Sequence, residues 1–324
     1  MRAVRFHDYG SPAVLRVDEV PVPQPGPGQL LVRVTAAGIG FADVQIRAGL
    51  MRQTALPGLP MPFSPGFEVA GTVADVGPGV DPATVGRRVV STTSGGGYAE
   101  MAVVSAAAAL PCPDALDDHQ ALALLGQGST AVGVVRAAAL QAGDTVLVEA
   151  AAGGVGSLLV QLARHAGATV IGVARGERKL AVAKRLGAHT VIDYTAPDWH
   201  EHVRDAARGS VQVVLETTGG SVSQAAFDLL APGTGRMVIY GMTSGQAPRF
   251  DPLAVYHRGV SVIGFASMAL PADHQTRLRD EAFALASDGA LKPIIGAVLP
   301  LSKAAAAHQA FEERTTIGKT LLTP

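Results

Sequence analysis

Apolar and polar residues follow two different periods along this chain. In residues 145–166, a short run of β-branched and apolar residues leads through small residues into an apolar stripe at Val155, Leu159, Leu162 and Ala166. Successive spacings of four, three and four place these side chains on one face of a helix. The pattern predicts a strand, a tight turn and a helix that packs back on a sheet.

The same alternation continues beyond this segment. It predicts six strands, at residues 145–149, 169–173, 190–193, 211–216, 236–240 and 260–264. Helices are expected near residues 155–166, 177–186, 198–208 and 221–230. Strands joined by helical crossovers form parallel sheets that are covered on both faces. The expected fold class is therefore α/β, with a doubly wound sheet.

The first third of the chain has short strand-like runs separated by proline and glycine. The runs lie at residues 3–6, 15–19, 30–36, 67–76, 88–91 and 98–104. This pattern is typical of an antiparallel, partly open barrel. Residues 117–139 are expected to be helical with a break at 126–130.

After residue 264 the pattern changes to amphipathic helices, at 273–288 and 303–313, and closing strands, at 294–300 and 319–322. We expect these strands to return to the barrel. Residues 1–120 and 265–324 would then form one domain, and residues 121–264 would be a domain inserted into it.

The turn before the striped helix fits the glycine fingerprint of dinucleotide-binding folds with one substitution, since Ala151 occupies the first glycine position. Gly153 lets the backbone approach a pyrophosphate, and Gly156 lets helix and strand pack closely. The helix start at Gly154 and Val155 offers free N–H groups to an anion. A tight turn without a ligand is the alternative interpretation.

The end of the next strand indicates which dinucleotide is bound. NAD sites usually place a carboxylate there to accept a hydrogen bond from the ribose 2′-hydroxyl. Here Arg175 follows the strand, and Lys179 lies a turn into the next helix. These cations suit a 2′-phosphate and predict NADPH. Because Glu177 is close by, NADH stays open, as does a solvated helix start without any ligand role.

Composition excludes several other classes of protein. With a net charge of −1 and 16% charged residues, the chain has no basic field for nucleic acid. No apolar run reaches the length of about 18 residues that a membrane span needs, and residues 1–10 alternate like a strand, so a cytoplasmic protein is expected. The single cysteine, Cys112, allows neither an internal disulfide nor a thiolate cluster for structural zinc.

Several motifs, taken together, resemble one known family. They span most of the chain, at residues 21–34, 38–43, 65–71, 97–100, 150–156, 235–241 and 318–322. The chain resembles the medium-chain dehydrogenase/reductase superfamily, and within it the zinc-free quinone oxidoreductase branch that includes zeta-crystallin. This resemblance implies a doubly wound Rossmann domain inserted in a GroES-like, partly open β-barrel catalytic domain.

The resemblance also implies cofactor contacts. Thr130 matches the threonine at the nicotinamide end. Tyr194 and Arg314 match residues that join the lysine equivalent to Lys179 around the 2′-phosphate in NADPH-using members. Segments after the fifth and sixth strands match the lining of the nicotinamide, and they contain Gly241, Met242, Phe265 and Ser267.

Positions near the substrate differ from those of other branches. Zinc-dependent relatives hold their metal with a cysteine and a histidine, and the matching positions here are Gly40 and Phe67. The resemblance therefore implies a metal-free site. Many quinone reductases carry asparagine and tyrosine where this chain has Gly40 and Gln45, so quinone specificity cannot be carried over. Gly40, Gln45 and Thr130 are the candidates for lining the substrate.

Without a Lewis acid, hydride transfer to a quinone or to the β-carbon of an α,β-unsaturated carbonyl compound is favoured over alcohol oxidation. Gln45, Thr130 and the N–H groups near Gly241 are candidate donors to the carbonyl oxygen. We assign no side chain as acid or base and expect the proton to come from solvent. Two alternatives are an NADPH-binding structural or regulatory protein with little turnover, as crystallins are, and a reductase of enoyl thioesters.

The sixth strand of the inserted domain commonly pairs with its twin across a dimer axis in this branch. Residues 260–265 are apolar enough to do so here. An unpaired strand edge is a liability that such pairing removes. A homodimer is therefore expected.

Overall fold

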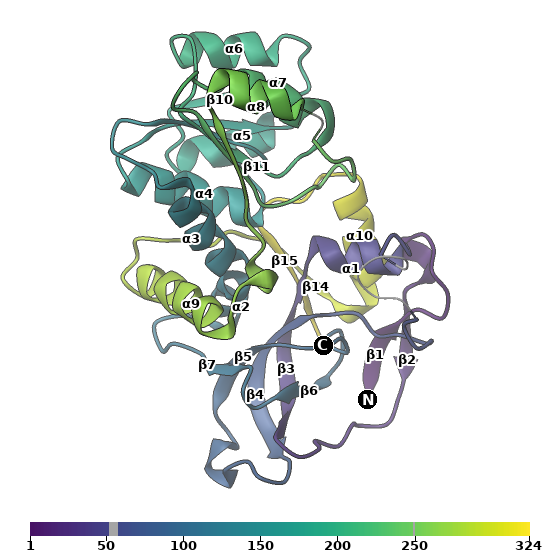
Figure 1. Ribbon diagram of the computed structural model, residues 1–324. Coiled ribbons are helices and arrows are strands. Elements are labelled where there is room, and N and C mark those ends of the chain that lie inside the picture. Colours follow the sequence, from purple (N-terminus) through teal and green to yellow (C-terminus); the bar gives the residue numbers. More distant parts are fainter. Residues whose placement is uncertain (52–57, 249) are drawn as a thin grey trace. The chain divides into compact units, whose positions relative to one another are not determined.

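The computed structural model describes residues 1–51, 58–248 and 250–324, and it divides into two compact units (Figure 1). The first unit comprises Met1–Gly126 and Ile294–Pro324, and the second comprises Gln127–Pro293. Residues 121–126 and 265–293 thus fall on the other side of the boundaries expected from the sequence. Residues 265–293 belong to the second unit for a packing reason, because helix α9 (Ala272–Ser287) lies against α3 (Gln127–Ala138) there.

The second unit is built on a six-stranded parallel sheet with the strand order β10-β9-β8-β11-β12-β13. Its strands are β8 (Thr145–Val148), β9 (Thr169–Ala174), β10 (Thr190–Asp193), β11 (Val213–Glu216), β12 (Arg236–Ile239) and β13 (Ser261–Gly264). The crossover helices are α4 (Gly154–His165), α5 (Glu177–Arg185), α6 (Trp199–Ala206), α7 (Gly220–Asp228) and α8 (Pro252–Arg258), and helices lie on both faces of the sheet (Figure 1). The predicted doubly wound fold is confirmed.

The core of this unit explains its nearly continuous apolar strands. Four neighbouring strands of the sheet each contribute a fully buried side chain, namely Leu147, Ile171, Val214 and Met237. Strands with helices on both faces read as apolar runs rather than as an alternation. Helix α4 is buried over more than its predicted stripe, since Leu158 is also buried while α3 packs against this helix.

The first unit contains a seven-stranded sheet with the path β14-β15-β3-β4-β5-β7, and β6 pairs with β3 beside this path. The strands are β3 (Gln29–Ile39), β4 (Glu68–Val76), β5 (Arg88–Thr92), β6 (Met101–Ser105), β7 (Ala109–Pro111), β14 (Ile295–Pro300) and β15 (Lys319–Thr323). A separate pair is formed by β1 (Arg2–Arg5) and β2 (Arg16–Glu19). The long strand β3 holds the unit together, because β4, β6 and β15 all pair with it antiparallel.

The helices of the first unit are α1 (Phe41–Arg47), α2 (Asp118–Leu125) and α10 (Ala304–Glu312). The sequence pattern did not predict α1 or, in the second unit, α8. It also placed a break at residues 126–130, whereas α3 already begins at Gln127 and only Gly126 separates it from α2. Glycine and serine in residues 126–130 suggested a loop, but their packing decides in favour of a helix.

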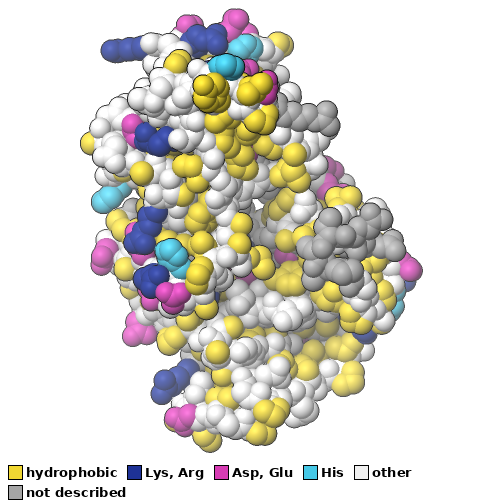
Figure 2. Space-filling model, viewed as in Figure 1, with side chains coloured by type: hydrophobic (Ala, Val, Ile, Leu, Met, Phe, Trp, Pro, Cys, Tyr) yellow, Lys and Arg dark blue, Asp and Glu magenta, His cyan; other side chains and the backbone are white. Residues whose placement is uncertain are grey.

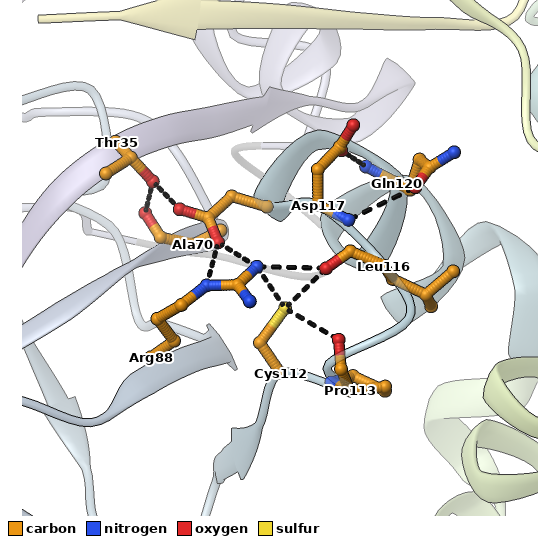
Figure 3. A network of polar contacts seen from close by, with 9 residues as sticks. Thr35, Ala70, Arg88, Cys112, Pro113, Leu116, Asp117 and Gln120 are labelled. Carbon is orange, nitrogen blue, oxygen red and sulfur yellow. Dashed lines mark hydrogen bonds and ion pairs between the residues drawn. The ribbon is translucent and has the colours of Figure 1, made fainter. Parts of the chain in front are cut away.

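A polar network fixes the start of α2 (Figure 3). The Arg88 guanidinium donates to Asp118 (2.7 Å), to the carbonyl oxygen of Leu116 (3.0 Å) and to Cys112 Sγ (3.2 Å). Thr35 donates to the other carboxylate oxygen of Asp118 at 2.6 Å. Burial raises the pKa of the Cys112 thiol, although the charge of Arg88 opposes this. Cys112 is thus a small buried residue of a structural network.

Charged side chains are interspersed on the face shown in Figure 2, where blue and magenta groups lie close together among hydrophobic ones. In the described part of the chain, no single helix is both long and apolar enough to cross a membrane, although α2 and α3 taken together pass that test.

Candidate functional site: a dinucleotide crevice

The turn between β8 and α4 is rich in glycine, and at Gly156 the backbone leaves no room for a side chain. A Cβ atom on Gly156 would lie 2.2 Å from the carbonyl oxygen of Ala150. One on Gly154 would lie 2.2 Å from Oε1 of Gln127. Gly153 is the N-cap of α4, with φ −75° and ψ 175°. The first N–H groups of a helix have no partner within it, so this turn presents donors to an anion.

The turn opens at the point where the order of the sheet reverses. Strands β8 and β11 are neighbours, while the chain continues from β8 to β9 on the other side. Ligands of open α/β sheets bind at the carboxyl ends of the strands beside such a reversal. Gly241 follows the next strand, β12, and a Cβ atom on it would lie 2.2 Å from Oγ1 of Thr217, which follows β11. The loops after β11 and β12 therefore meet.

Three of the predicted nicotinamide contacts lie together in the second unit. Thr130 on α3 donates a hydrogen bond to Oγ of Ser267 at 3.4 Å. Phe265 lies against the same helix, since a Cβ atom on Gly133 would lie 2.1 Å from the Phe265 ring. Met242, after β12, is 41% exposed. A hydroxyl pair and an aromatic ring thus gather beside the ends of β12 and β13.

The residues at the ends of β9 and β10 that are predicted to meet the adenosine end of the cofactor, called the rim below, lie only partly as expected. Arg175 is exposed after β9, and Tyr194 follows the neighbouring strand β10 and packs in part against the core. Asp193 is a carboxylate that also lies at this rim, and the sequence analysis did not consider it. Asp193 Oδ2 accepts from the N–H of Gly176 (2.8 Å), and Oδ1 accepts from the N–H and hydroxyl of Thr195 (2.9 and 2.7 Å).

Asp193 is held as an anion by these contacts. Burial opposes its ionisation, but the hydrogen bonds from Thr195 and Gly176 and the charge of Arg175 keep its pKa below the ordinary value. Its two oxygens already accept three hydrogen bonds from the protein. Lys179 is half-buried on α5, and Arg314 belongs to the first unit, where it follows α10 with φ 55°.

The first unit places the other predicted positions around a buried acid. Asp43 on α1 accepts from the N–H of Gly40 (2.8 Å) and from the N–H of Gly66 (2.9 Å). Burial raises the pKa of Asp43 to about 6, although these hydrogen bonds and Lys319 lower it. Gln45 lies half-buried on the same helix. Asp43 thus ties the segment before α1 to the segment before β4.

An ion pair lies beside this acid. Lys319 Nζ pairs with Glu68 Oε2, and the Lys319 side chain is only 2% exposed. Gly38 leaves room for the pair, because a Cβ atom there would lie 2.8 Å from Cε of Lys319 and 2.9 Å from Oε2 of Glu68. The carboxylate of Glu68 is therefore neutralised by a buried cation from β15.

Comparison with known proteins agrees with this fold. Residues 26–114 match the family model of the alcohol dehydrogenase GroES-like domain, and residues 154–284 match that of zinc-binding dehydrogenase. The chain is 37% identical over 335 residues to 2-haloacrylate reductase of a Burkholderia species, with 99% of this chain and 98% of the relative covered. The chain belongs to the medium-chain dehydrogenase/reductase superfamily.

Two solved structures of this superfamily refine the placement. Escherichia coli quinone oxidoreductase complexed with NADPH is 30% identical, with a TM-score of 0.90 and full coverage of both chains. A structure described as an NAD-dependent alcohol dehydrogenase is 34% identical, with a TM-score of 0.87 and the same coverage. The predicted assignment to the quinone oxidoreductase branch of medium-chain dehydrogenases/reductases is confirmed, and the chain is an oxidoreductase.

The family resemblance implies that the metal-binding cysteine and histidine of zinc-dependent relatives correspond to Gly40 and Phe67 here. A glycine and a phenyl ring supply no ligand atom from their side chains. The acids nearby are engaged, since Asp43 accepts two backbone N–H groups and Glu68 pairs with Lys319. Among the residues that the structure describes, no three or more His, Cys, Asp and Glu side chains gather as a metal site would require.

Glu149 and Glu216 are two buried acids at the carboxyl ends of β8 and β11 that the sequence analysis did not single out. Glu149 directly follows β8, and Glu216 ends β11. Both are fully buried. A usable signal was present, because each acid directly follows a run of apolar strand residues at the end where ligands bind.

Proposed function

We propose that this medium-chain dehydrogenase/reductase is an NADPH-dependent, zinc-independent reductase that transfers hydride to a quinone or an α,β-unsaturated carbonyl compound. The observation that carries this proposal is the pair Gly40 and Phe67 at the metal-ligand positions of the family. Alcohol oxidation in this family relies on a metal that lowers the pKa of the hydroxyl group. A conjugated acceptor needs no such help, because its electrons end on a stabilised oxygen.

NADPH, when bound, supplies the hydride. The N–H groups at the start of α4 (Gly154, Val155 and Gly156) would hold its pyrophosphate, because Gly153 and Gly156 allow a close approach of the backbone. Arg175 would bind the 2′-phosphate together with Lys179 and Tyr194 of the same unit.

Asp193 does not argue against this choice of cofactor. Its oxygens accept from Gly176 and Thr195, which leaves it poorly placed to accept from a ribose 2′-hydroxyl as the acid of an NAD site does. The E. coli relative is described as complexed with NADPH, which supports the proposal.

At the other end of the crevice, Thr130, Phe265, Ser267, Gly241 and Met242 would line the nicotinamide. The Phe265 ring and the Met242 side chain would exclude water from its face, and the Thr130 hydroxyl would orient it. Holding donor and acceptor carbons at about 3 to 3.5 Å is the main task that remains for the protein. Gly40 and Gln45 are the proposed substrate-lining positions of the first unit.

The relative named 2-haloacrylate reductase favours a conjugated carbon–carbon double bond as the acceptor, since a haloacrylate is an α,β-unsaturated acid. Hydride then adds to the β-carbon, and a proton completes the reduction at the α-carbon. We assign no side chain to this proton and propose that it comes from solvent. Asp43 is already engaged by two backbone N–H groups, which supports a structural role for it.

An acceptor panel tests the proposal. Oxidation of NADPH and of NADH would be followed with quinones, enones, 2-haloacrylate and enoyl thioesters, before and after exhaustive treatment with a metal chelator. We expect acceptor-dependent oxidation of NADPH, a kcat/KM at least about tenfold lower with NADH, and no loss after chelation. A preference for NADH, an activity restored only by zinc, or NADPH binding without turnover would contradict it.

We further propose that the protein is a cytoplasmic homodimer that pairs through β13. This strand is at the edge of the six-stranded sheet, and Val262 and Ile263 on it are half-buried in the single chain. Light scattering should give twice the mass of one chain at micromolar concentration. Replacing Val262 with Lys should shift the measured mass toward that of the monomer. If the unmodified protein itself has the mass of a single chain, the dimer is refuted.

A further inference from the structure

Glu149 and Glu216 lie next to each other at the carboxyl ends of the paired strands β8 and β11. Val148 is in register with Leu215, and the N–H of Glu149 donates to the carbonyl oxygen of Leu215 at 3.1 Å. The next residues along the two strands are Glu149 and Glu216. Parallel neighbours in register are about 4.8 Å apart and direct their side chains to the same face. The two carboxyl groups therefore share one buried space.

Each of these carboxyl groups has one oxygen that accepts hydrogen bonds from the backbone of a loop. The hydroxyls of Thr218 and Ser223 also lie close enough to lower the pKa of Glu149 and Glu216, respectively, although burial outweighs them. Glu149 Oε2 accepts from the N–H groups of Thr217 (3.3 Å) and Thr218 (3.0 Å), and Glu216 Oε1 accepts from the N–H of Gly219 (2.6 Å). Glu149 Oε1 and Glu216 Oε2 have no hydrogen-bond partner within the described residues. A buried, unsatisfied oxygen is costly, and more so if it is charged.

No cation among the described residues compensates the two acids. Within residues 1–51, 58–248 and 250–324, neither acid forms an ion pair, and no Lys, Arg or His is a main influence on either pKa. Burial and then the charge of Glu216 raise the pKa of Glu149 to about 7, and burial raises that of Glu216. The third titratable group here is Tyr240, whose pKa is raised far above its ordinary value by burial and by both acids.

A proton on one of the carboxyl groups would reduce both the uncompensated negative charge and the number of buried oxygens without a hydrogen bond. It leaves a single negative charge in the buried space, and it supplies a donor to the unsatisfied oxygen of the other group. Two carboxyl groups at close range cannot both ionise readily near neutral pH. Such a proton would belong to the pair rather than to one residue.

The pair also lies next to the turn at which the dinucleotide is proposed to bind. Only Ala150 to Ala152 separate Glu149 from the glycine turn at Gly153, and the loop that Glu149 holds begins at Thr217 on the other side of the sheet reversal. Thr217 in turn touches Gly241, one of the proposed nicotinamide-lining positions. Glu149 thus links the two sides of the crevice through its carboxyl group.

We propose that Glu149 and Glu216 hold one proton between them, and that this proton positions the crevice loops and limits the negative charge beneath the pyrophosphate of the bound dinucleotide. Loss of the proton to solvent places a second negative charge close to an anionic ligand. Binding should therefore weaken as the pH rises, and the dinucleotide should take up a proton when it binds in alkaline solution. Both acids act through position and charge rather than on the reacting atoms. The inference rests on the proposed binding of NADPH.

The test compares the unmodified protein with Glu149→Gln, which keeps a carbonyl oxygen for Thr218 and cannot ionise. The dissociation constant of NADPH would be measured from about pH 7 to about pH 9, above the range in which the 2′-phosphate of the ligand titrates. For the unmodified protein we expect an increase of about tenfold, and for Glu149→Gln less than about twofold. Glu201→Gln, which removes an exposed acid on α6, is the matched control and should follow the unmodified protein.

Calorimetry provides a second readout that a purely structural role would not change. Titrating NADPH near pH 8 in buffers of different ionisation enthalpy gives the number of protons taken up. We expect roughly half a proton or more for the unmodified protein and for Glu201→Gln, and close to none for Glu149→Gln. Glu216→Gln should behave like Glu149→Gln, and it replaces that variant if the latter does not fold.

The outcomes separate this inference from the function on which it rests. Equal proton uptake and equal pH dependence in Glu149→Gln and the unmodified protein would overturn the shared proton while leaving NADPH binding intact. An unmodified protein that binds neither NADPH nor NADH at any pH would overturn the proposed function and this inference together. A change in melting temperature of Glu149→Gln with unchanged proton uptake would reduce the pair to a structural role.

Discussion

Both units of this oxidoreductase bury acidic side chains, and they neutralise them in different ways. In the first unit, Glu68 is paired with the buried Lys319, and Asp43 accepts two backbone N–H groups. In the second unit, Glu149 and Glu216 lie together without a described cation in an ion pair with either. The first unit uses a fixed charge, and the second relies on a proton.

The difference has a physical consequence for each unit. A buried ion pair fails when one partner is removed, because the other charge stays behind without compensation. A pair neutralised by a proton fails instead when the pH rises. The second unit has its cation Arg175 exposed at the rim, where a ligand can reach it. The charge of the first unit thus serves its structure, and Arg175 in the second unit is placed to meet a ligand.

The largest expected effect comes from breaking the ion pair of the first unit. Lys319→Met should lower the free energy of unfolding by roughly 3 kcal/mol, because Glu68 is left largely buried and unpaired. Urea denaturation monitored by circular dichroism measures this loss.

Two variants control this experiment. The double change Glu68→Gln with Lys319→Met should recover much of the loss, and Lys303→Met, at an exposed lysine, should have little effect. A Lys319→Met protein as stable as the unmodified one would show that the first unit does not depend on a fixed charge.

Stability of the second unit should depend on pH through Glu149. The pKa of this acid is raised by burial and by Glu216 to about 7 in the folded state, above its ordinary value of 4.5. The folded state therefore binds the proton more tightly than the unfolded chain does. Stability should fall as the pH rises from about 4.5 to about 7, by on the order of 2 to 3 kcal/mol, and then level off.

Urea midpoints at a series of pH values test this slope. Glu149→Gln should lose most of the fall between about pH 6 and about pH 7, while the contribution of Asp43, whose pKa is about 6, should persist in both proteins at lower pH. A Glu149→Gln protein with the same profile as the unmodified one would remove the contrast between the two units.

A third prediction concerns backbone rather than charge. In Gly156→Ala the new Cβ atom would meet the Ala150 carbonyl oxygen at 2.2 Å, which forces α4 away from the turn. We expect NADPH binding, measured by fluorescence titration, to weaken about thirtyfold, or about 2 kcal/mol. Gly264→Ala is the control, because a Cβ atom there meets nothing within 4 Å. Unchanged affinity in Gly156→Ala would show that the close packing is not needed.

The smallest expected effect is at the rim. Arg175→Ala should weaken NADPH binding about tenfold, or about 1.4 kcal/mol, and leave NADH binding unchanged, since only NADPH carries the 2′-phosphate. Arg178→Ala removes an exposed arginine of the same segment and serves as the control. If both cofactors weakened equally, Arg175 would contribute general attraction rather than selectivity.

Much of the fold was predictable from local patterns, and the misses have specific causes. The strands of the second unit and the start of α4 followed from apolar runs and glycine spacing. Helix α1 was missed because it has only seven residues and follows glycines. Helix α8 had a readable signal in Asp251, which caps it by accepting from the N–H of Leu253, and in the proline at its start.

The candidate site was predictable where a position follows from the turn itself, as for Gly153 and Gly156. It was not predictable where two strands must first be neighbours. Asp193 reaches the rim only because β10 pairs with β9, and Glu149 faces Glu216 only because β8 pairs with β11.

The sequence by itself determined the alternation of strands and helices, the glycine turn and the absence of ligand side chains at Gly40 and Phe67. Each depends on residues that are adjacent or regularly spaced along the chain. The tertiary structure alone decided which buried acids meet a lysine and which meet each other. That choice depends on strand order and register, which bring together residues 67 and 251 positions apart, as in Glu149 with Glu216 and Glu68 with Lys319.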